Sequence, residues 1–123
     1  MRFPTVLWLG LACWSVPVLA AEPAPVDFVR EIEPLLTRYC QKCHGAERAR
    51  GGLRLDTAAG LATGGDSGPL FATTPDTPAL LWQVLSGAEG VSAMPPADNP
   101  RPTTEELGLI QRWLAEGAKR PAT

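Results

Sequence analysis

The stretch RYCQKCHGAE, residues Arg38 to Glu47, decides the fold because the most reactive side chains of the chain lie in this one short segment. The segment holds two of the three cysteines, Cys40 and Cys43, and the only histidine, His44. A Cys-x-x-Cys pair occurs in short-loop disulfides, redox-active dithiols and zinc sites and, when histidine follows directly, in haem attachment sites. The rest of the sequence discriminates among these four chemistries.

The first 21 residues have the pattern of an export signal. Arg2 is followed by an apolar run from Val6 to Trp14, and small residues at Ala20 and Ala21 suit a signal peptidase. The apolar stretch from residue 6 to residue 21 has 16 residues, fewer than the roughly 20 that a membrane-spanning helix requires. We therefore expect residues 1–21 to be a signal peptide and the protein to be periplasmic or otherwise exported, with membrane contact only if this segment is retained.

The remaining residues, 22–123, are expected to form one domain with a core at about residues 27–118. The 123-residue chain has 12 glycines, 13 prolines and only 7% aromatic residues, which favours short helices joined by long loops. A group other than side chains is expected to complete so small a core. Without Arg2 the chain has 10 basic and 13 acidic residues, a net charge of −3, and no basic cluster. This composition excludes nucleic acid as a partner.

The residue inventory disfavours three of the four chemistries. Structural zinc needs four soft ligands, and the chain without its signal offers only Cys40, Cys43 and His44. A thioredoxin-like dithiol follows a strand, whereas residues 28–39 have helical periodicity. A plain disulfide leaves His44 unexplained. Haem attachment uses all three residues, because the two thiols add to the vinyl groups and the adjacent imidazole reaches the iron.

Few residues in the chain could serve as the second axial ligand of a haem iron. Apart from Tyr39, the chain without its signal has one further residue of a usual haem-ligand type, Met94. It lies within a 17-residue stretch without helix or strand signals, Ser86 to Pro102, a length that usually indicates function. Pro95 and Pro96 stiffen the chain where the thioether would be presented. The alternative is that Met94 fills a gap in the core.

The segment before the cysteines is predicted to be helical. Apolar residues recur on one helical face from Phe28 to Tyr39, with Asp27 placed to cap the N-terminus. Pro34 interrupts the pattern, which predicts a kink or a new helix start at Glu33-Pro34.

Three further helical segments follow the cysteines. Asp56 is expected to cap one turn that runs through Leu61. Thr77 and Pro78 are expected to start a helix over ALLWQVLS that stops at Gly87. A capping box from Thr103 to Glu106 predicts a last helix that ends at Gly117 and packs Trp113 on the first helix.

Taken together, the motifs resemble the planctomycete-type cytochrome c domain. The shared elements are IEPLL at residues 32–36, CQKCHG at 40–45, GGLRLDT, GGDSGP, Met94-Pro95-Pro96 and a closing RWLAEGA. The resemblance implies an all-α, cytochrome c-like fold of about three to five short helices around one covalently bound haem c, with long loops. It also implies thioether bonds from Cys40 and Cys43, His44 as the proximal iron ligand and Met94 as the distal ligand.

This ligand set implies a mono-haem carrier of single electrons rather than an enzyme. The alternatives are an electron-entry subunit docked on a periplasmic dehydrogenase, or a haem-based ligand sensor or peroxidase-like protein if Met94 does not bind the iron. Arg54 and Arg101 are the candidates for contacts with the haem propionates. The expected partners are redox proteins, with a basic docking face to match the acidic net charge, and the protein itself is expected to be a monomer.

Overall fold

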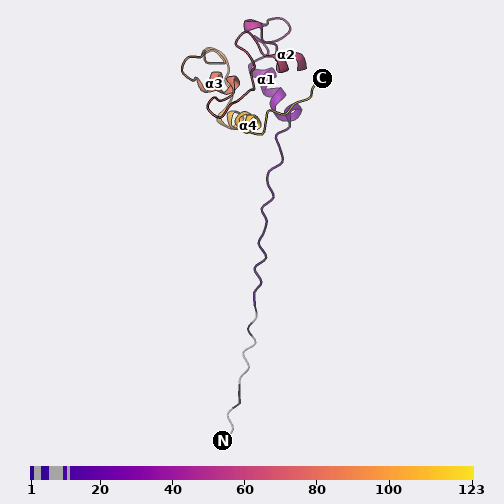
Figure 1. Ribbon diagram of the computed structural model, residues 1–123, viewed down its shortest axis with the longest axis vertical. Coiled ribbons are helices and arrows are strands. Elements are labelled where there is room, and N and C mark those ends of the chain that lie inside the picture. The colour runs from indigo at the N-terminus through magenta and orange to yellow at the C-terminus, as the bar shows by residue number, and fades with distance from the viewer. Residues whose placement is uncertain (2–3, 6–9, 11) are drawn as a thin grey trace.

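The computed structural model describes residue 1, residues 4–5, residue 10 and residues 12–123. Arg2 and most of the apolar run from Val6 to Trp14, which carry the predicted signal, lie outside the described residues. Residues 12–25 are exposed, have no regular structure and run outward from the folded body (Figure 1). None of the described helices is long and apolar enough to cross a membrane.

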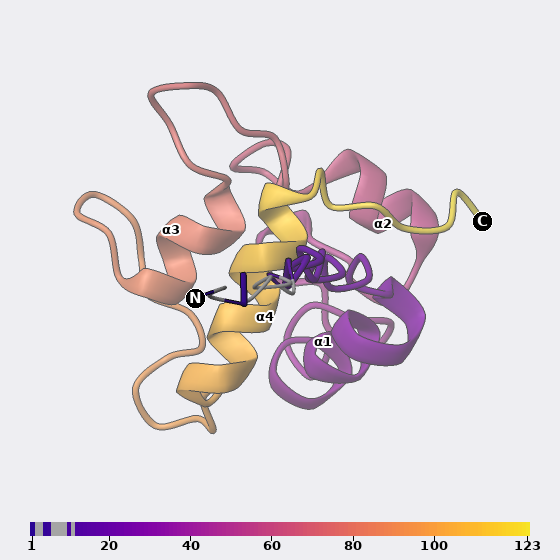
Figure 2. The same cartoon turned by 90° about the horizontal axis from the view of Figure 1, so that it is seen from below.

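The predicted all-α class is confirmed in this part of the chain. Four α-helices and two single-turn helical segments are present, and the described residues form isolated β-bridges but no strand. The α-helices are α1 (Glu33–Tyr39), α2 (Ala58–Thr63), α3 (Leu80–Ser86) and α4 (Thr104–Ala115). In Figure 2, α4 lies between α3 on one side and α1 and α2 on the other.

The predicted interruption of the first helical segment is confirmed. A π-helical turn (Phe28–Ile32) begins after Asp27, whose carboxylate accepts a hydrogen bond from the Arg30 N–H at 3.0 Å. A separate helix, α1, then begins at Glu33, with Pro34 in its first turn. Proline suits this position because the first N–H groups of a helix have no intrahelical acceptor.

The last helix, α4, has the predicted start and end. The Thr103 hydroxyl accepts from the Glu106 N–H at 3.2 Å, and the Glu106 carboxylate accepts from the Thr103 N–H at 2.8 Å. Gly117 follows the helix with a φ of 98°, which favours glycine over residues with a side chain. Trp113 is fully buried with its ring 5.7 Å from that of Phe28, so the predicted packing on the first helical segment is confirmed.

The predicted start of α2 at Asp56 is wrong by one residue. The cap is Thr57, whose hydroxyl accepts from the Gly60 N–H at 3.0 Å. The Asp56 carboxylate is engaged instead by the Arg54 guanidinium, with two N–O distances of 2.7 Å. An ion pair two residues back in the chain therefore removes Asp56 from the capping role.

The predicted start of α3 is also wrong, although its end at Gly87 is confirmed. The helix begins at Leu80, after Ala79 with a non-helical ψ of 141°, and no side chain caps it. The backbone groups of Thr77 bond instead to those of Thr74, at 2.9 and 3.3 Å, in a preceding turn. Since that turn fixes Thr77, the helix cannot start until the chain has left it.

The core lies between these helices and the loops that join them. Its fully buried side chains are Trp113, Ile32 and Leu36, and the Phe71 ring meets Trp113 edge-on at 5.0 Å. Leu55, Leu70, Leu81 and Leu85 belong to the same buried cluster. These four leucines also form one wall of a cleft beside the Cys-x-x-Cys-His turn.

Candidate functional site

The candidate site begins where α1 ends. The Cys40 N–H donates to the Leu36 carbonyl at 2.9 Å, and the N–H groups of Cys43 and His44 both point back to the Cys40 carbonyl at 3.2 and 3.0 Å. This tight turn brings both sulfur atoms and the imidazole to one side of the chain. Both thiols are free, both are half-buried, and both line the cleft.

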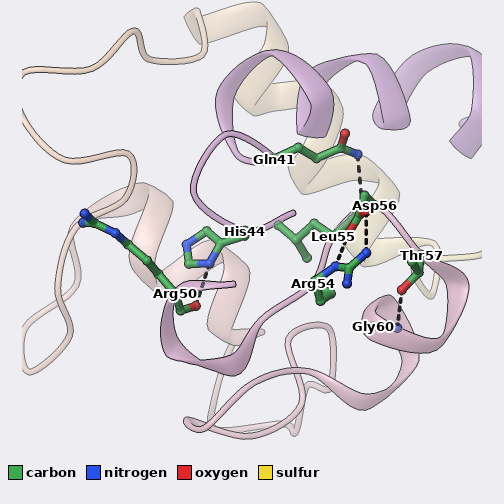
Figure 3. A network of polar contacts seen from close by, with 8 residues as sticks. All are labelled: Gln41, His44, Arg50, Arg54, Leu55, Asp56, Thr57 and Gly60. Atoms are coloured by element: carbon green, nitrogen blue, oxygen red, sulfur yellow. Dashed lines mark hydrogen bonds and ion pairs between the residues drawn. The ribbon is translucent and has the colours of Figure 1, made fainter. Parts of the chain in front are cut away.

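The imidazole of His44 is oriented by a backbone carbonyl. Its Nδ1 lies 2.9 Å from the carbonyl oxygen of Arg50 (Figure 3). Because a carbonyl can only accept, Nδ1 carries the proton, and Nε2 keeps its lone pair for a metal ion. A histidine that ligates a metal commonly has this arrangement, since the bond from its other nitrogen fixes both ring orientation and tautomer.

Further hydrogen bonds hold the backbone around His44. The Leu55 N–H donates to the His44 carbonyl at 2.8 Å, and the Gln41 side-chain amide donates to the Leu55 carbonyl at 3.1 Å (Figure 3). The Arg50 N–H donates to the Cys43 carbonyl at 3.0 Å. The segment from residue 50 to residue 55 therefore braces the backbone of the Cys-x-x-Cys-His turn.

The cleft is a cavity of about 230 Å³ that adjoins a wider hollow of about 610 Å³. His44 and Met94 line both the cleft and the hollow. The first one also contains the two cysteines, so we take it as the centre of the site. Its wall is mostly aliphatic: Leu53, Leu55, Leu70, Leu81, Val84 and Leu85.

Met94 reaches this cleft from the long loop between α3 and α4. Its N–H donates to the carbonyl of Val84, in α3, at 2.8 Å, which fixes the loop against the cleft wall. The Met94 side chain is half-buried, and the following Pro95 is buried. The two residues expected as axial ligands, 50 positions apart in the sequence, thus line the same cavity.

These residues fit a covalently bound haem. The cleft offers two free thiols at the required spacing, an imidazole with an available Nε2, a thioether and apolar walls for a porphyrin. Burial, and secondarily the neighbouring Cys43, raises the pKa of the Cys40 thiol to about 11, so that thiol is neutral at physiological pH. In the described part of the chain no three His, Cys, Asp or Glu side chains form a metal site of their own.

The two predicted propionate contacts do not line the cleft. Arg54 is paired with Asp56, and Arg101 donates to the Pro95 carbonyl at 2.6 Å. The basic residues that do line it are Arg38, Lys42 and Arg50, and no acidic residue among those described joins them. Their position in the sequence could have indicated this, since Lys42 lies inside the Cys-x-x-Cys-His motif and Arg38 and Arg50 lie within six residues of it.

Residues 40–98 match the family model of planctomycete cytochrome C. The resemblance predicted from the sequence is confirmed over these residues, and the matched segment contains Cys40, Cys43, His44 and Met94. It indicates a c-type cytochrome electron carrier with covalently bound haem c. Comparisons with curated proteins and with solved structures find no match.

Proposed function

We propose that the protein is an exported, mono-haem cytochrome c that transfers single electrons and in which His44 and Met94 are the axial ligands of the iron. The observation that carries the proposal is that His44 and Met94 line one apolar cavity together with both free thiols. When bound, haem c supplies a one-electron couple. The residues of the chain hold the group, set its ligand field and keep water away from it.

Each side chain has a distinct role in this proposal. Cys40 and Cys43 anchor the porphyrin edge, and His44 offers Nε2 because Nδ1 is engaged by Arg50. Met94 supplies a soft thioether, which favours ferrous iron and raises the reduction potential. The aliphatic wall lowers the local dielectric constant, which disfavours the more highly charged ferric state.

The proposal describes an electron carrier rather than an enzyme. When protein side chains hold both axial positions, no position on the iron is open to a substrate, and the change of oxidation state needs little rearrangement of ligands. A ligand sensor or a peroxidase-like protein requires an open sixth position. The ligation of Met94 therefore separates the proposed carrier from these alternatives.

The charges at the cleft favour an acidic docking face on the partner, in place of the basic face expected from the net charge. The net charge of the chain is −2, yet the charged residues that line the cleft are Arg38, Lys42 and Arg50. Arg38 forms an ion pair with Glu106, with 3.1 Å between Nη1 and Oε1. Lys42 and Arg50 are therefore the principal local charges. These local charges, more than the net charge, set the electrostatic field that an electron donor or acceptor experiences as it docks at the haem edge.

The test is expression with haem-maturation machinery, followed by extraction with acidified organic solvent and intact mass measurement. We expect the colour to stay with the polypeptide and the mass to include one haem. In a Cys40→Ala/Cys43→Ala variant we expect no covalent haem and a largely unfolded chain, because the haem completes the core. A haem that leaves with the solvent, or a double variant that melts cooperatively near the parent, contradicts the proposal.

Spectroscopy of Met94→Ala tests the sixth ligand. We expect the ferric variant to lose the methionine-to-iron charge-transfer band and the ferrous variant to bind carbon monoxide readily. Val91→Ala is the matched control, since Val91 lines the adjoining hollow but has no donor atom, and its spectra should equal those of the parent. If Met94→Ala leaves the ferric spectrum unchanged and the parent already binds carbon monoxide, the sensor or peroxidase-like alternative is correct.

A further inference from the structure

The loop that carries Met94 has few backbone donors of its own. Prolines occupy positions 95, 96, 100 and 102, and proline has no N–H group. From Met94 to Arg101, the backbone hydrogen bonds are those of Met94 N–H to the Val84 carbonyl and of Asn99 N–H to the Pro96 carbonyl, at 2.8 and 2.9 Å. Few N–H groups of the loop itself are therefore available to the carbonyls next to Met94, and a side chain can supply the missing donors.

Arg101 supplies those donors. Its Nη1 donates to the Pro95 carbonyl at 2.6 Å, and its Nη2 lies 3.5 Å from the Met94 carbonyl. Two arms of one planar guanidinium thus reach two consecutive carbonyls, a match that the geometry of arginine permits and that of lysine does not. Arg101 belongs to none of the ion pairs formed by the described residues, so no carboxylate competes for these donors.

We infer that Arg101 is a positioning residue that closes the Met94 loop and holds the thioether over the haem site. The inference rests on the proposed ligation by Met94 and deepens it. Arg101 does not line the cleft, and it acts through the backbone carbonyls of Met94 and Pro95. Its role is to keep the loop closed, so that exogenous ligands do not reach the sixth position.

The experiment compares holoprotein variants by carbon monoxide affinity in the ferrous state and by the charge-transfer band in the ferric state. Loss of a hydrogen bond from a charged donor shifts the opening equilibrium of the loop by about 10-fold or more. We therefore expect Arg101→Gln to raise the carbon monoxide affinity by about this factor and to weaken the band. Arg101→Lys keeps the charge but loses the fork, and its affinity should fall between those of Arg101→Gln and the parent.

Arg120→Gln is the matched control. Arg120 also donates from Nη1 to a backbone carbonyl, that of Ala118 at 2.9 Å, but it lies away from the cleft. We expect this control to leave both spectroscopic readouts unchanged. If Arg101 has a purely structural role, Arg101→Gln lowers the melting temperature and leaves the two spectroscopic readouts at parent values. That result overturns the inference.

Met94→Ala distinguishes the two levels of failure. If Met94→Ala opens the site but Arg101→Gln and Arg101→Lys behave as the parent does, the role of Arg101 is rejected and the His44/Met94 ligation stands. If Met94→Ala has no effect on the spectra, both the ligation and the positioning role are rejected. If Arg101→Gln fails to fold, the affinity of Arg101→Lys decides, and a parent value refutes the role.

Discussion

Gly45 is the residue at which the structure makes its sharpest prediction about the haem-binding turn. A Cβ atom at this position would lie 2.4 Å from the carbonyl oxygen of Gln41 and 3.3 Å from its carbonyl carbon. Both neighbours are backbone atoms of the same turn, so they cannot rotate away as a side chain would. Relief of the clash requires the backbone between Gln41 and Gly45 to move, and this segment contains Cys43 and His44.

We expect Gly45→Ala to destabilise the holoprotein by about 1–3 kcal/mol, the usual cost of overpacking a fixed site. The matched control is Gly108→Ala, because Gly108 lies within α4 and a Cβ there meets no atom within 4 Å. Replacing a helical glycine with alanine should stabilise the protein by about 0.5–1 kcal/mol. The two alanine variants should therefore differ by about 1.5–4 kcal/mol, with opposite signs relative to the parent.

Thermal unfolding followed by haem absorption measures this difference. For a domain of this size, 1 kcal/mol corresponds to about 4–8 °C in Tm. We expect Gly45→Ala to melt below the parent, with a lower yield of attached haem, and Gly108→Ala to melt above it. A Gly45→Ala protein with the parent's Tm and haem yield would show that the turn relaxes freely, which would refute the close packing around His44.

Two further predictions concern α4. Trp113→Ala should cost about 3–5 kcal/mol in urea unfolding, because Trp113 is fully buried, and a loss below 1 kcal/mol would contradict its place in the core. The hydrogen bond from the Thr103 N–H, and next that from the Tyr39 hydroxyl, hold the pKa of Glu106 below the ordinary value of a glutamate. The charged Glu106 carboxylate therefore stabilises the fold above the ordinary pKa of glutamate, and this stabilisation is lost as the pH falls through the lowered pKa. In a plot of the urea midpoint against pH, Glu106→Gln should therefore show a smaller fall on the acid side than the parent does.

The sequence predicted those helix boundaries that depend on contacts within one turn. Asp27 and the pair Thr103 and Glu106 make hydrogen bonds three residues apart, as the sequence pattern predicts, and no other partner among the described residues takes the capping oxygens away from these N–H groups. Prediction failed at Asp56 and Thr77 because another partner competes for each of them. In one case that partner is the guanidinium of Arg54, and in the other it is a backbone turn with Thr74.

The candidate site was predictable to the extent that scarce residue types define it. A chain with one histidine and, after residue 21, two cysteines and one methionine leaves few choices, and the structure brings all four residues to one cavity. The arginines were not predictable in this way. A long basic side chain finds its partner through tertiary placement, and composition says nothing about whether Arg101 turns toward the cleft or toward the carbonyl of Pro95.

The two sides of the cleft are linked through a single carboxylate. The Tyr39 hydroxyl, one residue before Cys40, donates to Oε2 of Glu106 at 2.8 Å, and the same oxygen accepts from the Thr103 N–H at 2.8 Å. Thr103 follows Arg101 by two residues, and Arg101 holds the Met94 loop. The first turn of α4 therefore ties the cysteine turn to the methionine loop, so the separation between His44 and Met94 depends on the docking of α4.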